Sequence, residues 1–283
     1  MSADRPHSRW WIPLGALLLT ALYLPSLATP FDMVDDGNLV YAEAPMPLGE
    51  RVDVAWQKVL ANMRTLGPFR PTLWAHWEVT AEVAQGSPFV WRLLRLCWIF
   101  FAASMLLWLL RELGIHPMAA LLAGMIVMWN RYRNEIWTSL TLSEGVAMPY
   151  AMLTLIAAVK ASRSRRPWRW DLIGSLSLLI ALGRKNTFVA LVPAQLWLRR
   201  RIGSESLREG LSQKWKRCLL LSLPLLLPLG HYVYFKMNWH QGQYLFDGPS
   251  IAQLGRILRS MQGAISLPFL AVGLILAIYA MRG

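Results

Sequence analysis

The chain of 283 residues has little charge and very little cysteine. Asp, Glu, Lys and Arg make up only 16% of it, whereas 55% is hydrophobic, so its apolar groups cannot be hidden behind a charged surface as in a soluble domain. The two cysteines, Cys97 and Cys218, fall inside apolar runs and are predicted to be small buried residues without disulfide or metal spacing. The five histidines form no cluster at ligand spacing, so no metal site is predicted. The solvent of most of this chain is therefore expected to be lipid.

The positive charge of the chain has a topological meaning. A net charge of +13 would indicate nucleic-acid binding in a soluble protein, but here Lys and Arg lie in loops between apolar runs. We therefore expect membrane lipids as partners and no nucleic acid.

Apolar runs long enough to cross, or partly cross, a bilayer recur along the whole chain. They predict an all-α, polytopic transmembrane helical bundle with about eight spans, forming one domain over residues 1–283. The expected spans are residues 10–28, 89–110, 117–129, 146–159, 171–182, 187–198, 218–235 and 265–280.

The orientation follows from the flanking charges. Arg5 and Arg9 precede the first run, which predicts a cytoplasmic N-terminus in a multi-pass protein of the plasma (inner) membrane. A cleaved signal peptide is the alternative, because residues 26–28 resemble a cleavage site, although the run is longer than the usual 7–15 residues of a signal core. The basic segments 160–170 and 199–217 are expected to be cytoplasmic.

Two longer segments are expected on the outer side. Residues 29–88 form the first outer loop, and residues 236–263 form a later one. Each contains an apolar stripe at helical spacing, over residues 52–63 and 251–261, which predicts amphipathic helices at the membrane interface.

The segment between the two basic blocks is too short for two complete crossings. It has 28 residues, 171–198, so each arm of about 13 residues rises only about 20 Å. A short hairpin is predicted, with its tip at residues 183–186 lying below the outer surface. Arg184 and Lys185 are at this tip.

Two cations at this depth call for an anion, because ionisable groups inside a membrane cost about 2.5–3.5 kcal/mol each unless they face a cavity or a partner. The candidates are Glu144, the acids of the first outer loop, or a bound phosphate. Snorkelling of Arg184 and Lys185 to the lipid headgroups is the alternative. Arg131 and Arg133 are expected at the same outer level, either supporting the site or forming an interfacial salt-bridge cluster with nearby acids.

An acidic pair lies near the start of the first outer loop. Asp35 and Asp36 precede Gly37, which allows a sharp turn close to the membrane surface. Carboxylates crowded at an apolar boundary have raised pKa values, so either could be a general base. An ordinary solvated turn is the alternative.

The order of these parts resembles the polytopic GT-C glycosyltransferases, in the branch of protein mannosyltransferases and lipid A aminoarabinose transferases. The shared features are one span, a long outer loop that begins with Asp35 and Asp36, residues 69–71 before two tryptophans, and short paired spans with a basic tip. The resemblance covers residues 10 to about 280. The family's further spans and C-terminal soluble domain are missing, which leaves open a short or truncated member.

The resemblance implies transfer of a sugar from a polyprenyl-phosphate donor to a lipid, glycan or protein acceptor on the outer face, with inversion. It assigns Asp36 or Asp35 as the base, and Arg184 and Lys185, with Arg133 as a weaker match, as ligands of the lipid phosphate. Glu144 and Arg131 are supporting residues. No cofactor is required, and a divalent metal is not excluded. The alternatives are a non-catalytic membrane subunit and a transporter or lipid flippase, which inverted repeats would favour.

Overall fold

The computed structural model describes residues 10–29, 47–65, 70–129, 134–140, 143–202, 223–226 and 230. Within these ranges the chain is all-α, with helices joined by turns and no strand. The elements are α1 (Trp11–Ala21), η1 (Leu24–Ala28), α3 (Leu48–Thr65), α4 (Pro71–Ala84), α5 (Pro88–Glu112), α6 (Pro117–Met128), α7 (Asn134–Thr138), α8 (Glu144–Arg163), α9 (Pro167–Leu182), η2 (Asn186–Ala190), α10 (Leu191–Ile202) and η3 (Leu223–Leu225).

Proline defines where four of these helices begin. Pro71, Pro88, Pro117 and Pro167 are the first residues of α4, α5, α6 and α9. Proline suits this position because its fixed φ is already helical and its missing N–H would have no partner there. Ser87 adds a side-chain cap to α5 by accepting a hydrogen bond from the Val90 amide.

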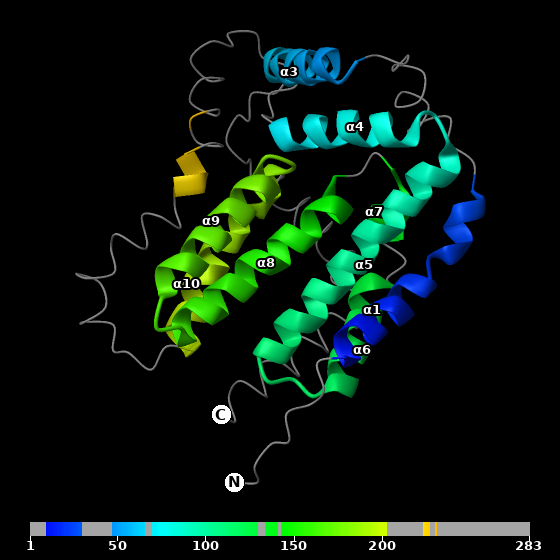
Figure 1. Cartoon of the computed structure of the whole chain (residues 1–283). Coiled ribbons are helices and arrows are strands. Elements are labelled where there is room, and N and C mark those ends of the chain that lie inside the picture. The colour runs from blue at the N-terminus through cyan, green and yellow to red at the C-terminus, as the bar shows by residue number, and fades with distance from the viewer. Residues whose placement is uncertain are drawn as a thin grey trace, which may run out of the picture.

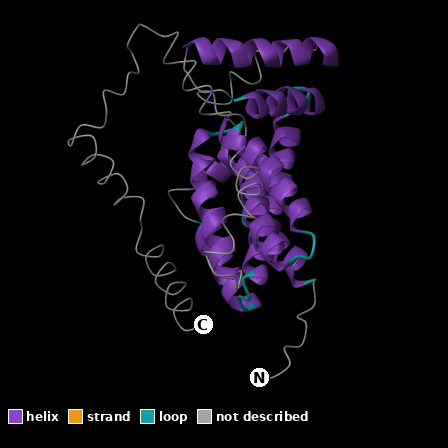
Figure 2. Ribbon diagram, turned by 90° about the vertical axis from the view of Figure 1, so that its left-hand side faces the viewer, coloured by secondary structure: helices purple, strands orange, loops and turns teal. Residues whose placement is uncertain are grey.

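The helices form a bundle with a second layer across one of its ends. Figure 1 and Figure 2 show α3 and α4 stacked over that end, with their axes across those of α5 and α8. Helix α5 packs against α1, α6, α8 and α4, while α8 also packs against α9 and α10. We call the covered end the α4 end. The opposite end, where α5 and α8 finish near Glu112 and Arg163, is called the basic end.

Ion pairs join the two helices of the covering layer. Arg51 on α3 pairs with Glu82 on α4 at 2.6 Å and lies 3.7 Å from Glu78. Lys58 on α3 also pairs with Glu78, at 2.7 Å, and lies over the Trp74 ring. Helix α3 is the amphipathic helix predicted over residues 52–63.

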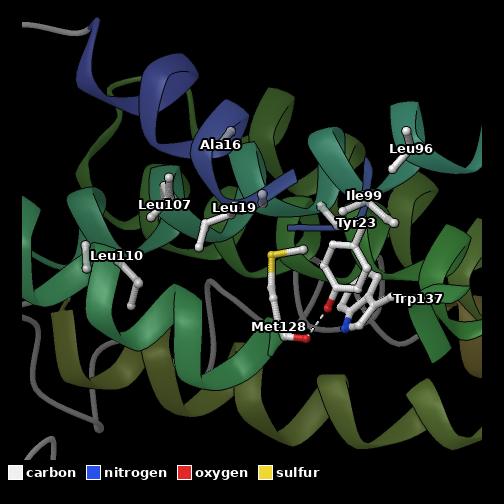
Figure 3. Packing of buried hydrophobic residues seen from close by; sticks show 12 residues of the cluster. Ala16, Leu19, Tyr23, Leu96, Ile99, Leu107, Leu110, Met128 and Trp137 are labelled. Carbon is white, nitrogen blue, oxygen red and sulfur yellow. Dashed lines mark hydrogen bonds between the residues drawn. The ribbon is translucent and has the colours of Figure 1, made fainter. Parts of the chain in front are cut away.

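One apolar cluster joins α1, α5 and α6 (Figure 3). Leu19, Leu107 and Met128 are fully buried in it, and the Tyr23 hydroxyl donates a hydrogen bond to the Met128 carbonyl. Glycine allows the close approach, since a Cβ on Gly124 would lie 2.8 Å from Leu19 Cδ1. Small residues are typical of helix contacts in membranes, where van der Waals packing drives association.

Among the described residues, two helices are long and apolar enough to cross a membrane. Helix α5 has 25 residues and α8 has 20, which correspond to lengths of about 37 and 30 Å. Large apolar side chains also cover the outside of the bundle, among them Leu14, Leu17, Leu18, Met118, Leu122, Leu172 and Leu176. A surface of this kind indicates contact with lipid, because soluble proteins rarely expose large apolar patches.

Two sequence expectations need correction. Cys97 is not buried but exposed on the outer surface of α5, because lipid accepts a small apolar side chain as readily as the core does. The first apolar run is not one helix, since α1 ends at Ala21 and a 3-10 turn follows from Leu24 to Ala28. Pro25 lies in that turn, and proline disfavours α-helical geometry in the residue before it.

Several other expectations lie outside the described residues. These are most of the first outer loop before α3, nearly all of the span at 218–235, the loop at 236–263 and the span at 265–280.

Candidate functional site

The tip of the predicted hairpin lies at the α4 end. Helices α9 and α10 have 16 and 12 residues, so each arm is shorter than the roughly 20 residues of a full span. The Thr72 hydroxyl on α4 donates a 2.8 Å hydrogen bond to the Ile180 carbonyl near the end of α9. At Gly183 a Cβ would lie 2.7 Å from Thr72 Oγ1. The hairpin tip is therefore packed against the first turn of α4.

Arg184 is buried at this tip. Only 3% of the residue is exposed, and its Nε and Nη1 atoms have no hydrogen-bond partner among the residues that the structure describes. His76 on α4 and Tyr150 on α8 are close enough to interact with it electrostatically. Buried guanidinium groups are nearly always hydrogen-bonded, so these two donors indicate a place for an acceptor. Snorkelling to the headgroups does not describe an arginine with this degree of burial.

Lys185 forms an ion pair, whereas Arg184 forms none with the described residues. The Lys185 ammonium pairs with Glu144, the first residue of α8. The acids Glu78 and Glu82 on α4 pair with α3 instead. Of the anions considered as partners for the tip, Glu144 thus neutralises Lys185, and Arg184 keeps its charge without an ion pair among the described residues.

A third cation lies beside the tip. Arg70 immediately precedes α4 and is close enough to Lys185 to act on it electrostatically. Its Nε is buried without a hydrogen-bond partner among the described ranges, and burial lowers the pKa of its guanidinium. Arg70, Arg184 and Lys185 with Glu144 therefore form a site with an excess of positive charge.

Two buried arginines on α5 were missed by the sequence analysis. Arg95 donates to the carbonyl of Trp137 at 3.1 Å and to that of Ile136, and Arg92 donates to the carbonyl of Thr138. They hold the last carbonyls of α7, which have no partner within that short helix. The available signal was two arginines spaced i, i+3 within a long apolar run, which must share one face and avoid lipid.

His76 is a neutral member of the site. Its ring lies edge-on to the Trp98 ring, with 5.4 Å between the ring centroids. The centroids of the Trp98 and Tyr150 rings are 5.9 Å apart. Burial, followed by the positive charges of Arg184 and Arg95, lowers the pKa of His76 from 6.5 to about 3. At neutral pH this imidazole therefore adds hydrogen-bonding capacity without adding charge.

The structure brings together three of the residues expected in the site, Arg184, Lys185 and Glu144. The expected base, Asp36 or Asp35, the expected phosphate ligand Arg133 and the supporting Arg131 lie outside the described residues.

No metal centre is present in the described part of the chain, where no three His, Cys, Asp or Glu side chains lie together. The charged donors described at the tip are cationic, which suits an anion. An oxyanion with several acceptor oxygens, such as a phosphate, matches guanidinium and ammonium donors.

Comparison with known proteins identifies no relative. No family model matches the chain, and neither a curated protein nor a solved structure matches it.

Proposed function

We propose that this chain is a polytopic membrane glycosyltransferase of the GT-C type. It takes a sugar from a polyprenyl-phosphate donor and passes it, with inversion, to a lipid, glycan or protein acceptor on the outer face. The observation that carries the proposal is the buried Arg184, whose Nε and Nη1 have no hydrogen-bond partner among the described residues, next to Lys185, on which Arg70 acts electrostatically.

The proposed topology has eight crossings, a cytoplasmic N-terminus and a plasma (inner) membrane location. The distribution of charge supports the orientation. The basic end carries the cations Lys160, Arg163, Arg165, Arg166 and Arg169. Positive residues are retained on the cytoplasmic side, so the α4 end faces outward.

The different surroundings of Lys185 and Arg184 support phosphate binding. Lys185 is oriented by Glu144, while Arg184 retains two buried N–H donors. A desolvated guanidinium binds an oxyanion strongly, because the low local dielectric strengthens the interaction and no water competes. The same contact stabilises the charge that develops on a departing phosphate.

The reaction is a single displacement. Asp36, or Asp35 in its place, accepts the proton of the acceptor hydroxyl or amine as the new bond to the anomeric carbon forms. The bond from that carbon to the phosphate oxygen breaks, and its electron pair leaves with the polyprenyl phosphate. Arg184, Lys185 and Arg70 hold that phosphate, and Arg133 is a further proposed ligand. No second carboxylate is needed as a nucleophile.

A function limited to binding is the second proposal. Glu144, the one carboxylate that the described residues place at the tip, is paired with Lys185, which favours binding of a lipid phosphate without chemistry. A lipid flippase or a non-catalytic subunit would use the site in this way.

Transfer of labelled sugar from a polyprenyl-phosphate donor, measured in membranes that contain each variant, separates the two functions. We expect Arg184→Gln to weaken both donor binding and turnover. Asp36→Asn should retain donor binding and lose roughly 10²–10⁴-fold in rate, as general bases typically contribute. Arg165→Gln removes an exposed charge at the basic end and is the matched control.

Two results would contradict the proposal. Full transfer by the Asp35→Asn, Asp36→Asn double variant would exclude both residues as the base. Donor binding that is unchanged in Arg184→Gln would exclude the phosphate site. Donor binding without transfer in the unaltered protein would favour the binding function.

A further inference from the structure

A cavity lies at the basic end, far from the hairpin tip. It has a volume of about 380 Å³ and opens between α1, α5 and α8. Its apolar lining includes Ile12, Met105 and Trp108, and its charged lining residues are Arg111, Glu112 and Lys160. This volume falls within the roughly 300–1,000 Å³ of small-molecule sites.

One of the cations that line this cavity forms no ion pair with the described residues. Glu112 accepts hydrogen bonds from Lys160 at 2.7 Å and from the Trp108 indole at 2.9 Å, and its backbone carbonyl accepts one from Arg163. In the described part of the chain no side chain pairs with the Arg111 guanidinium. The local charge is therefore positive, and Arg111 is available to a ligand.

The apolar side of the cavity continues along α5. Phe101, Ser104, Trp108 and Arg111 follow at intervals of three and four residues, so they share one face of the helix. Phe101 is 49% exposed, one turn of α5 before Ser104, which lines the cavity. Along the axis of α5, this face therefore changes from the cationic Arg111 to the apolar Phe101.

We propose that this cavity binds an anionic phospholipid, with its phosphate at Arg111, beside the Lys160–Glu112 ion pair, and its acyl chains along the Phe101 face. The positive charge of Arg111 favours an anionic headgroup, and the face of α5 with Phe101 accommodates the acyl chains. Basic pockets between helices on the cytoplasmic side of a membrane are known to bind such headgroups. The site is separate from the proposed donor site, so either proposal can fail alone.

Native mass spectrometry of the full chain, released from nanodiscs of phosphatidylcholine with or without phosphatidylglycerol, tests the proposal. We expect the unaltered protein to retain phosphatidylglycerol in preference to phosphatidylcholine. Arg111→Gln should lower that preference roughly five-fold, the factor expected for one basic residue near anionic lipid. Arg165→Gln should leave it unchanged, since that side chain is exposed outside the cavity.

A second variant tests the cavity without altering its charge. Ser104→Trp fills the space between α1 and α5 and should reduce the retained lipid of both kinds, with folding checked by thermal unfolding. The same lipid preference in Arg111→Gln as in the unaltered protein would overturn the proposal. So would equal effects of Arg111→Gln and Arg165→Gln, which indicate only a general charge effect, or displacement of the lipid by inorganic phosphate alone.

Discussion

Lys185 in the turn after α9 forms an ion pair with Glu144, the first residue of α8, although 41 positions separate them in sequence. This contact joins the hairpin tip to α8, a helix long and apolar enough to cross a membrane. It orients one cation of the candidate site and sets it apart from the neighbouring Arg184.

The first prediction concerns this pair. Glu144→Gln and Lys185→Met should each destabilise the protein, and a double-mutant cycle should give a coupling of roughly 0.5–3 kcal/mol, the range for side chains in contact. Thermal unfolding in detergent measures it. The exchanged pair Glu144→Lys, Lys185→Glu is the control and should recover part of the loss. A coupling near zero would show that the pair does not hold the tip.

The second prediction is a pH dependence from His76. Its pKa is lowered to about 3 in the folded protein, whereas the unfolded chain takes up the proton near pH 6.5. The unfolded state therefore binds more protons between these values, so stability is complete above pH 6.5 and falls as the pH is lowered toward 3. The slope from one proton is at most about 1.4 kcal/mol per pH unit. His76→Gln should flatten it, and an unchanged profile of unfolding against pH would contradict this origin.

The third prediction compares two glycines. A Cβ at Gly145 would lie 2.7 Å from both the Ile136 carbonyl oxygen and Arg95 Nη2, so Gly145→Ala should destabilise by about 1–3 kcal/mol, as overpacking does. A Cβ at Gly49 on α3 meets nothing within 4 Å, so Gly49→Ala should be neutral or stabilising. Unfolding midpoints give the comparison. Equal midpoints for the two variants would show that α7 does not pack closely on α8.

The fourth prediction concerns topology. In a variant with Cys97 and Cys218 replaced by serine, a cysteine at Arg165 should be protected from an impermeant thiol reagent in intact cells. A cysteine at Ala44 should be labelled from outside. Cysteines within 199–217 should be protected like the one at Arg165. Labelling of either basic segment from outside would reverse the proposed orientation and place the α4 end in the cytoplasm.

The residues that share a helix could be predicted from the sequence, because helix limits depend on local chemistry. Apolar runs of sufficient length and a 28-residue limit between basic blocks predicted α5, α8 and the short hairpin with its basic tip. The amphipathic pattern of residues 52–63 predicted α3 in the same way. Each of these signals acts within a few turns of chain.

The neighbours of each side chain were decided only by the tertiary structure. Helices that are apolar on all sides carry no stripe to show which face is inward, so the exposure of Cys97 could not be predicted. Three further features could not be predicted either: the pairing of Lys185 with Glu144, the burial of Arg184 beneath α4, and the hydrogen bonds from Arg95 to α7. These contacts join residues about 40 to more than 100 positions apart, and whether they form depends on packing between helices, which no local pattern of residues specifies.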